Sequence, residues 1–336
     1  MEYSNIGIIG AGNWGTTLAL YLNKRGVGVT LFEPIEARAE KLKKERENKD
    51  FLPGYKIPED IVITSKQEEL ISKSEFVFFV LPSNFLKEVA NSFKEYIDKD
   101  NIVASFTKGV DPDTLRRMSE VIEEEILSQK GEVVAVSGPS IAREVVKGVP
   151  TSLVAASFNP DKAKIIQKRL SSDRMRVYTS SDILGVELGG AFKNVYAIAS
   201  GICDGMELGM NAKAALLTRS MAELSRLGSK MGGESATFSG LSGFGDLIVT
   251  SFSSHSRNRT VGEKLGEGKK LEDILSKMIE VAEGIRTTKS ICKLSDKYEV
   301  KMPVAREIYS VLYENKDPLD SIKDLMKREL KRERKK

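Results

Sequence analysis

The chain has 336 residues, enough for two domains with separate cores. Its 52 lysines and arginines nearly balance 48 aspartates and glutamates, and a formal net charge of +4 gives no general footprint for nucleic-acid binding. No apolar run reaches the length of a membrane span, and no residues have metal-ligand spacing. Two cysteines, Cys203 and Cys292, and no signal-peptide pattern predict a cytoplasmic protein without a disulfide framework.

A glycine motif stands near the start of the chain. IGIIGAGNWG (6–15) begins with a short β-branched run, which leads into Gly10, Gly12 and Gly15 at G-x-G-x-x-G spacing around Asn13 and Trp14. A helix-forming stretch, TTLALYLNKRG, follows directly. The first glycine permits a sharp turn, the second a close approach to a pyrophosphate, and the third close packing of helix on strand. The motif in this context predicts a dinucleotide site, with a purely structural turn as the alternative.

An acidic residue follows at the expected distance. VGVTLFE (27–33) reads as a second strand that ends at Glu33, where a carboxylate can accept the ribose hydroxyls of NAD and repel the 2′-phosphate of NADP. This favours NAD slightly. Arg38 lies close by in the sequence, so a second arrangement stays open, in which Glu33 turns away and Arg38 binds the phosphate of NADP.

Short apolar strands alternate with amphipathic helices up to about residue 180, which predicts a Rossmann-type, doubly wound parallel sheet in an α/β domain of residues 1–180. Several glycine, proline and polar residues fall just after strands, at the edge where open α/β sheets bind ligands. The eight predicted strands are IGIIG, VGVTLFE, DIVIT, EFVFFVLP, NIVASF, EVVAVSG, TSLVAA and MRVYTS.

From Ser181 onward the two-residue period of strands disappears and 3.6-residue patterning takes over. We therefore expect residues 181–336 to form an all-helical domain. Its first segment, 182–206, reads as one long helix and places Lys193 among small and apolar neighbours. Burial would lower the pKa of this lysine toward a useful acid–base range. Taken alone, however, a lysine lying along a helix face is the commoner situation.

Residues 240–266 combine a glycine-rich loop, one carboxylate and a polar cluster at a helix start. Asp246 can orient a lysine or bind a hydroxyl, and Ser256, Arg257 and Asn258 suit a phosphate monoester at a helix N-terminus. A plain N-cap with a surface arginine is the structural alternative. His255, the only histidine, has no carboxylate or cysteine partner in the sequence, so we interpret it as a loop residue.

A resemblance to a known family rests on seven ordered segments. They resemble the signature segments of the bacterial NAD(P)-dependent sn-glycerol-3-phosphate dehydrogenases between about residues 6 and 310. Two positions depart from the family pattern: Phe192, before the lysine, and Glu33-Pro34, where NADPH-binding residues are frequent. The segments are GAGNWGTTLA, TKG, SGPS, GGAFKNVYAIASGICDG, GLSGFGDLIVT, SHSRNR and VAEGIRTT.

The resemblance implies reduction of dihydroxyacetone phosphate to sn-glycerol 3-phosphate and the reverse, which supplies the backbone of phospholipids. It implies that Lys193 is the proton donor and acceptor, and that Lys108 holds substrate and cofactor in register. The implied substrate-binding residues are Lys108, Gly138, Ser140, Lys193, Asp246, Ser256, Arg257 and Asn258. Motif and resemblance together predict a cofactor site of Gly10, Gly12, Asn13, Trp14, Gly15, Glu33, Arg38, Lys108, Ala142, Arg257, Val281 and Glu283.

The resemblance further implies a homodimer, a small phosphorylated three-carbon substrate and NAD or NADP as cofactor. Two alternatives remain. β-Hydroxyacid and 6-phosphogluconate dehydrogenases share this domain order, but they place an asparagine four residues after the catalytic lysine, where this chain has Ala197. A dinucleotide sensor would keep the fold without needing a proton donor or a phosphate clamp.

Overall fold

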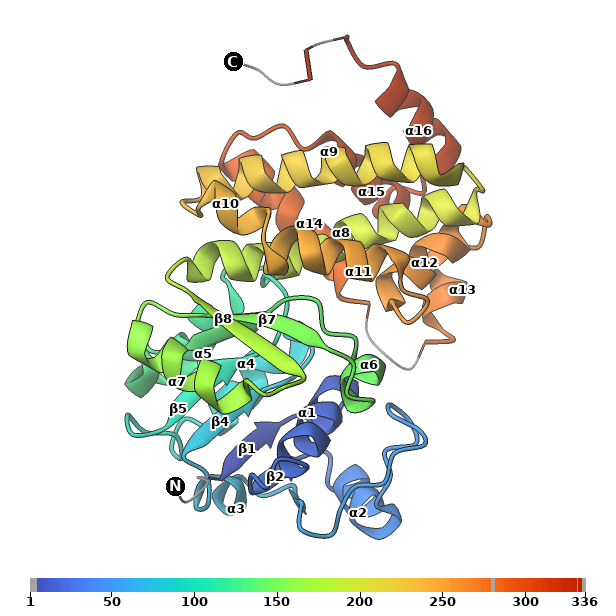
Figure 1. Ribbon diagram of the computed structural model, residues 1–336. Helices are drawn as coiled ribbons and strands as arrows, with labels where there is room; N and C mark the ends of the chain where they lie inside the picture. The colour runs from blue at the N-terminus through green and yellow to red at the C-terminus, as the bar shows by residue number, and fades with distance from the viewer. Residues whose placement is uncertain (1–4, 279–281, 331, 334–336) are drawn as a thin grey trace.

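The computed structural model describes residues 5–278, 282–330 and 332–333. Figure 1 shows two parts of the chain, with the sheet and its helices in the lower half and a group of helices in the upper half. The chain passes from one to the other after the last strand. All eight predicted strands are present within the described residues: β1 (Ile6–Ile9), β2 (Val29–Phe32), β3 (Val62–Thr64), β4 (Phe76–Phe79), β5 (Ile102–Ser105), β6 (Val134–Ser137), β7 (Thr151–Ala156) and β8 (Met175–Ser180).

The strands form one sheet in the order β3-β2-β1-β4-β5-β6-β7-β8. The order reverses between β1 and β4, and such a switch point opens a crevice beyond the carboxyl ends of the two strands. The helices that connect the strands cover both faces. They are α1 (Asn13–Asn23), α2 (Glu36–Glu45), α3 (Gln67–Ile71), α4 (Ser83–Ser92), α5 (Met118–Glu125), the short turn η1 (Leu127–Gln129), α6 (Ala142–Val146) and α7 (Pro160–Leu170).

The sheet differs from the predicted parallel arrangement at one strand pair. β1 to β6 run parallel, but β7 pairs antiparallel with β6, and β8 then pairs parallel with β7. The connection after β6 contains a single five-residue helix, α6. The prediction of a parallel sheet therefore holds for β1 to β6 and is wrong for β7 and β8, which run opposite to β6.

The central strands are buried on both faces. Along β4, Phe76 and Phe78 join the core beneath α1, and Val77 and Phe79 join the core beneath α4 and α5. A strand covered on both sides reads as a continuous apolar run, which is why EFVFFVLP shows no alternation. These two cores fix the strand ends from which the loops of the site arise.

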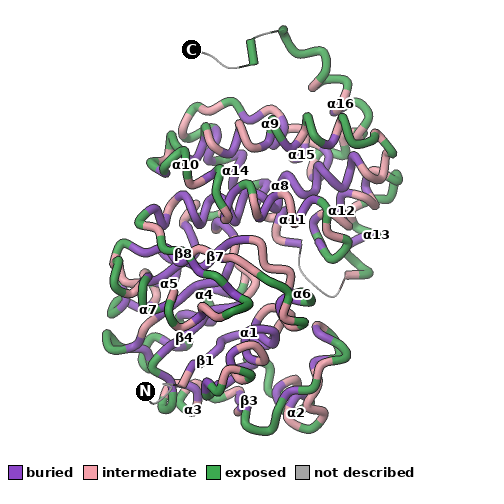
Figure 2. The backbone as a smooth tube through the Cα atoms, in the orientation of Figure 1, coloured by how far each residue is buried: buried purple, intermediate pink, exposed green. Residues whose placement is uncertain are grey.

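The second half of the described chain is helical, as predicted. Its core surrounds α8, which Figure 2 shows buried along nearly its whole length. None of the described helices has the length and apolar character to cross a membrane. The elements are α8 (Ile183–Gly205), α9 (Gly209–Lys230), α10 (Ser235–Phe238), the π-helical turn η2 (Leu241–Gly245), α11 (Asp246–Phe252), α12 (Arg257–Gly266), α13 (Leu271–Leu275), α14 (Glu283–Lys297), α15 (Pro303–Tyr313) and α16 (Pro318–Met326).

Candidate active site

The glycine motif forms a tight turn between β1 and α1. Gly10 has φ +114°, and a side chain there would collide with the Val80 carbonyl. A Cβ at Gly15 would strike the Gly10 carbonyl, whereas the Gly12 position faces open space. No described side chain caps the first turn of α1. The turn therefore presents free N–H groups and room beside Gly12, which is what a pyrophosphate at a helix N-terminus needs.

Glu33 and Arg38, the two residues predicted to discriminate between cofactors, are paired with each other. Glu33 is 3% exposed, accepts the Ile35 N–H at 3.2 Å and lies 3.4 Å from the Arg38 guanidinium. Burial raises the pKa of the Glu33 carboxyl, and the charge of Arg38 opposes that rise. Arg38 also stacks on Phe51, 4.8 Å from the ring centroid. Both groups lie near the carboxyl end of β2. This position fits either alternative, Glu33 on the ribose hydroxyls of NAD or Arg38 on the 2′-phosphate of NADP.

The chemistry-bearing residues meet at Asp246, which is 1% exposed. One of its carboxylate oxygens accepts a bond from Lys193 at 2.6 Å, and the other accepts a bond from Lys108 at 2.5 Å. Lys193 also donates to the Thr250 hydroxyl at 2.5 Å, and Lys108 donates to the Gly138 carbonyl at 3.2 Å. A single carboxylate therefore holds one lysine from the sheet domain and one from the helical domain.

Lys193 is 6% exposed, and desolvation lowers its pKa to about 8. The Asp246 carboxylate opposes this shift, while the charges of Lys108 and Arg257 reinforce it. An amine with a pKa near 8 exchanges its proton readily at neutral pH, and it is held in place here by two acceptors. The lysine is thus buried and coordinated, unlike a lysine that lies along an exposed helix face.

Local structure explains how Asp246 reaches Lys193. The glycine-rich stretch forms the π-helical turn η2, which passes directly into α11, and Asp246 is the first residue of that helix. η2 lies against α8 so closely that a Cβ at Gly189 would stand 3.0 Å from the Ser242 carbonyl. Thr250 follows Asp246 by one helical turn, which places both on the same face toward Lys193.

Gly138 and Ser140 lie in the loop after β6. Besides the Lys108 ammonium, the Gly138 carbonyl accepts the Ser140 hydroxyl at 3.0 Å. Ala142 begins α6, which packs against α1. The loop thereby joins the glycine turn to the lysine cluster, in line with the predicted grouping of these residues.

Asn258 lies where the first turn of α12 meets α8. Its side-chain amide donates to the Asn194 oxygen at 2.9 Å and accepts the Gly284 N–H at 2.8 Å. Ser256 is the N-cap and accepts the Arg259 N–H at 3.2 Å. Arg257 is exposed, and its charge acts on both Lys193 and Glu283. The predicted phosphate-binding residues therefore lie near the lysine cluster.

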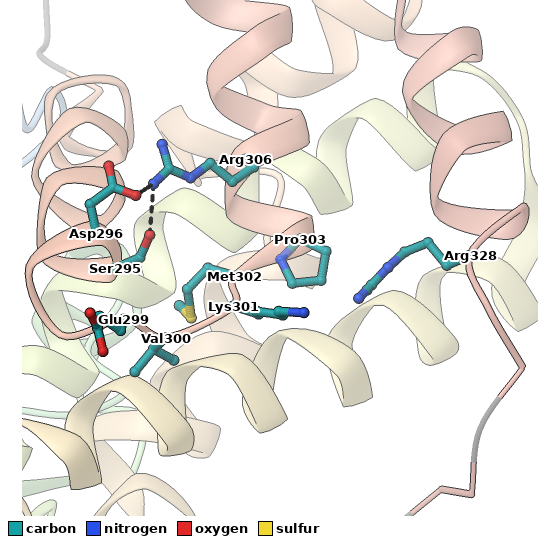
Figure 3. Close-up of a pocket in the computed structure, with 9 residues that line it drawn as sticks. All are labelled: Ser295, Asp296, Glu299, Val300, Lys301, Met302, Pro303, Arg306 and Arg328. Carbon is teal, nitrogen blue, oxygen red and sulfur yellow. Dashed lines mark hydrogen bonds and ion pairs between the residues drawn. The ribbon is translucent and has the colours of Figure 1, made fainter.

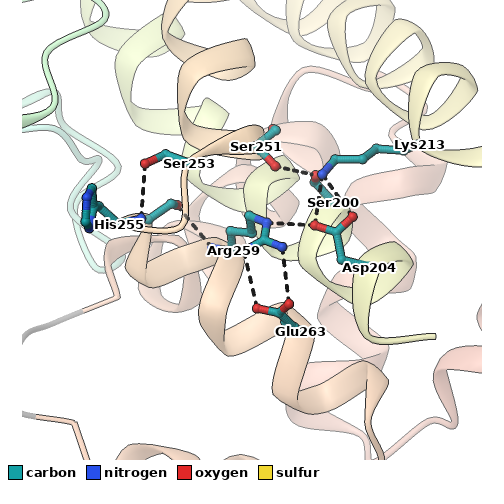
Figure 4. A network of polar contacts seen from close by, with 9 residues as sticks. Ser200, Asp204, Lys213, Ser251, Ser253, His255, Arg259 and Glu263 are labelled. Atoms are coloured by element: carbon teal, nitrogen blue, oxygen red, sulfur yellow. Dashed lines mark hydrogen bonds and ion pairs between the residues drawn. The ribbon is translucent and has the colours of Figure 1, made fainter. Parts of the chain in front are cut away.

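Close helix packing holds α12 in that position. A Cβ at Gly201 would strike the Arg259 carbonyl, and one at Gly262 would strike the Ile198 carbonyl, so the α8 and α12 backbones touch. Figure 4 shows the polar contacts beyond this contact surface. Asp204 accepts both Lys213, at 2.9 Å, and Arg259, at 2.7 Å. His255 is exposed, as expected of a loop residue, and its backbone N–H donates to the Ser253 hydroxyl at 3.1 Å.

Glu283 connects the two domains. Its carboxylate accepts the backbone N–H and the hydroxyl of Ser83, at 2.8 and 2.5 Å, where α14 begins opposite the start of α4. Desolvation raises the pKa of the Glu283 carboxyl. Val281, the other cofactor residue predicted from this segment, lies outside the described residues. Ser83, Asn194 and Thr250 were not predicted, and only the i, i+4 spacing from Asp246 to Thr250 offered a signal in the sequence.

A separate cavity of about 470 Å³ lies away from this cluster and contains none of the predicted site residues (Figure 3). Arg306 donates there to Ser295 and Asp296. The cavity lies where α14 and α15 meet and is lined by Ser295, Asp296, Glu299, Val300, Lys301, Met302, Pro303, Arg306 and Arg328.

A dinucleotide-type turn that faces a buried lysine and carboxylate across two domains is the arrangement of nicotinamide-dependent dehydrogenases. The fold alone is shared with D-mandelate dehydrogenase, solved with NADH, at 15% identity and a TM-score of 0.64 over 94% of this chain and 99% of that one. The chain belongs to the NAD-dependent glycerol-3-phosphate dehydrogenase family, whose N-terminal model matches residues 5–163 and whose C-terminal model matches residues 182–323.

Individual relatives agree with the family models. The chain is 46% identical to the glycerol-3-phosphate dehydrogenase [NAD(P)+] of Syntrophotalea carbinolica over 98% of its length and 99% of that protein. It is 42% identical to the Fusobacterium nucleatum enzyme of the same name over 98% of both chains. The crystal structure of the Coxiella burnetii glycerol-3-phosphate dehydrogenase superposes with a TM-score of 0.92 at 36% identity, over 97% of this chain and 99% of that one.

Proposed function

We propose that this protein interconverts dihydroxyacetone phosphate and sn-glycerol 3-phosphate with NAD(P)H or NAD(P)+ as the cofactor. The observation that carries the proposal is the pairing of Lys193 and Lys108 on the two oxygens of Asp246. In this pairing a lysine of lowered pKa lies beside a second ammonium group, which also donates to the loop after β6. Family membership supplies the substrate class, and the cluster supplies groups able to act on it.

The bound nicotinamide supplies or accepts the hydride at the substrate's C2 carbon. As the ketone is reduced, negative charge develops on the carbonyl oxygen, and Lys193 delivers its proton to that oxygen. Asp246 and Thr250 hold the Lys193 ammonium in place, so that one N–H bond remains for the substrate. In the reverse direction the neutral amine of Lys193 accepts the hydroxyl proton.

Lys108, Gly138 and Ser140 position the reacting carbons between the sheet and α8. The Lys108 ammonium, held by Asp246 and the Gly138 carbonyl, stabilises the developing oxyanion and aligns substrate with cofactor. The phosphate of the substrate binds at the start of α12. Arg257 there supplies a planar fork of donors, and Ser256 and Asn258 add polar groups at the positive end of the helix.

The residues around the glycine turn fit a dinucleotide. The open space at Gly12 and the uncapped first turn of α1 suit the pyrophosphate. Asn13, whose buried side-chain oxygen has no hydrogen-bond partner among the described residues, lies there with Trp14. Glu33 and Arg38 would hold the adenosine ribose, with NAD slightly favoured. Lys108, Ala142, Arg257, Val281 and Glu283 complete the proposed cofactor site.

The experiment that tests this function is a pair of steady-state assays with dihydroxyacetone phosphate, one with NADH and one with NADPH. Turnover with either cofactor, together with much weaker reduction of unphosphorylated dihydroxyacetone, would support the proposal. Failure to oxidise either cofactor in the presence of the phosphorylated ketone would refute it. A preference for a 2-hydroxy acid such as mandelate would instead favour a different substrate on the same fold.

Further aspects of the proposal concern the cellular setting. We propose a homodimer in the cytoplasm that supplies glycerol phosphate for phospholipid synthesis, with no nucleic-acid partner. The free, buried thiols of Cys203 and Cys292 fit a reducing compartment. We place the domain boundary between residues 180 and 181, because β8 ends at Ser180 and Asp182 caps the following helix. Sedimentation velocity would test the dimer.

A further inference from the structure

A segment outside the predicted site reaches the glycine turn. Residues 46–61 connect α2 to β3, and within them Asn48 is 3% exposed. The Asn48 side-chain amide donates to the Ala11 carbonyl at 2.7 Å and to the Thr16 hydroxyl at 2.8 Å. Both acceptors belong to the β1–α1 turn, more than thirty residues earlier in the chain. Nothing in the sequence motif indicates this contact.

The two acceptors belong to residues that flank Gly12 in the sequence, and a Cβ at Gly12 would meet open space. Ala11 stands between Gly10 and Gly12, so its carbonyl orientation is tied to the direction of the neighbouring N–H groups. Thr16 lies on the first turn of α1, and its own N–H bonds to the Gly12 carbonyl at 3.0 Å. The Asn48 side-chain amide therefore holds both the Ala11–Gly12 peptide and the first turn of α1 in place.

The Asn48 backbone is anchored independently of its side chain. Glu47 forms a β-bridge with Lys56, the Leu52 N–H bonds to the Asn48 carbonyl at 2.7 Å, and the Ile57 N–H bonds to the Arg46 carbonyl at 2.8 Å. None of these contacts uses the side-chain amide, so they remain when Asn48 is replaced by alanine. The side chain therefore reaches the turn from a backbone that is held in place without the side-chain bonds.

We propose that Asn48 is a positioning residue for the dinucleotide: it holds the Gly10–Gly15 turn in the geometry that accepts the pyrophosphate. It acts through Ala11 and Thr16 and has no part in the chemical step. The inference rests on the proposed placement of the cofactor at this turn. Preorganised donors bind an anion without first having to be ordered, so loss of the support weakens binding and leaves the reacting groups unchanged.

The test measures the Kd for NADH in Asn48→Ala and in the wild type. Trp14, the single tryptophan, lies in the turn and reports binding through quenching of its fluorescence. Loss of one buried hydrogen-bonded support predicts a rise of about tenfold in Kd. In steady-state assays the KM for the cofactor rises in parallel, while kcat at saturating cofactor and the KM for dihydroxyacetone phosphate stay within about twofold of wild type.

Asn101→Ala is the matched control. Asn101 is also buried, at 8% exposed, and its amide donates to the Ser74 carbonyl at 3.1 Å, but at the amino edge of the sheet. Both variants lose a buried amide, and we expect both to lower the melting temperature, but only Asn48→Ala to raise the Kd. An unchanged Kd in Asn48→Ala, or an equal rise in Asn101→Ala, would overturn the proposal.

Thr16→Val covers the case in which Asn48→Ala does not fold. Valine keeps the volume of this buried residue and removes the hydroxyl acceptor, so the Kd should rise while Thr16→Ser stays near wild type. Equal Kd values for Thr16→Val and Thr16→Ser would then count against the proposal. Failure of the proposed function is seen separately, because a wild-type protein that neither binds NADH nor reduces dihydroxyacetone phosphate fails before any variant is compared.

Discussion

The sheet side and the helix side of the site are built in different ways. On the sheet side, Gly10, Lys108 and Gly138 each follow the end of a parallel strand by one to a few residues. On the helix side, Lys193, Asp246, Asn258 and Glu283 come from four different helices. Strand ends are placed by backbone pairing within one sheet, whereas α11, α12 and α14 are placed by packing of side chains and glycines against α8.

This difference predicts separate functional effects. Changes on the sheet side should act mainly on dinucleotide binding, because the turn and β2 lie in the crevice of the sheet. Changes on the helix side should act on turnover and on recognition of the substrate phosphate. Two groups of residues are exceptions. Asp246 and Glu283 each bond across to the other domain, to Lys108 and Ser83 respectively. Lys108 and Gly138 lie on the sheet side but are proposed to act on the substrate.

The largest expected effect is on the helix side, at the buried lysine. Lys193→Ala should lower kcat by about a hundred- to ten-thousandfold, because the developing oxyanion loses its proton donor. The Kd for NADH, measured by Trp14 fluorescence, should stay near wild type. Lys230→Ala, at the exposed end of α9, is the control and should retain full turnover. Near-normal kcat in Lys193→Ala would remove this lysine from the chemical step.

Arg257→Ala should act mainly on binding of the substrate phosphate. Loss of a charge-assisted contact to the phosphate predicts a rise of about ten- to a hundredfold in the KM for dihydroxyacetone phosphate. The weak reduction of unphosphorylated dihydroxyacetone should hardly change, because that substrate offers nothing for the guanidinium to hold. Comparing kcat/KM for the two ketones measures the effect directly. Equal losses with both ketones would show that Arg257 acts on another group.

The pKa of Lys193 sets the expected pH dependence. Reduction needs the protonated amine, so its kcat should fall about tenfold per pH unit above a pKa of about 8. Oxidation needs the neutral amine, so its kcat should rise toward the same pH and then level off. Rates from pH 6 to 10 in both directions test this. Asp246→Asn should move the transition to lower pH, because the Asp246 charge raises the Lys193 pKa. A reduction rate that stays level through pH 9 would contradict the assignment.

The success of the sequence predictions also differs between the sheet side and the helix side of the site. The glycine turn and all eight strands were predicted, because their signals lie within ten residues of one another. The direction of β7 was not, since the residue pattern of a strand does not indicate which way it runs in the sheet. The contact of Glu283 with Ser83 joins residues 200 positions apart and depends on how α14 packs against α4. On the helix side, the proposed roles came from resemblance to a family, because the residues alone left ordinary structural alternatives open.

The smallest effect is expected on the sheet side, at the end of β2. Glu33→Ser removes the buried charge paired with Arg38, and the freed guanidinium, still stacked on Phe51, becomes available to a 2′-phosphate. The wild type should use NADH somewhat better, and the variant should shift the ratio of kcat/KM values toward NADPH by about tenfold. Glu36→Ser, an exposed carboxylate on the first turn of α2, is the control and should leave the ratio unchanged. If the wild type instead prefers NADPH clearly, then Arg38 already serves the phosphate, and Glu33 acts by orienting Arg38 and capping the Ile35 N–H rather than by binding the ribose.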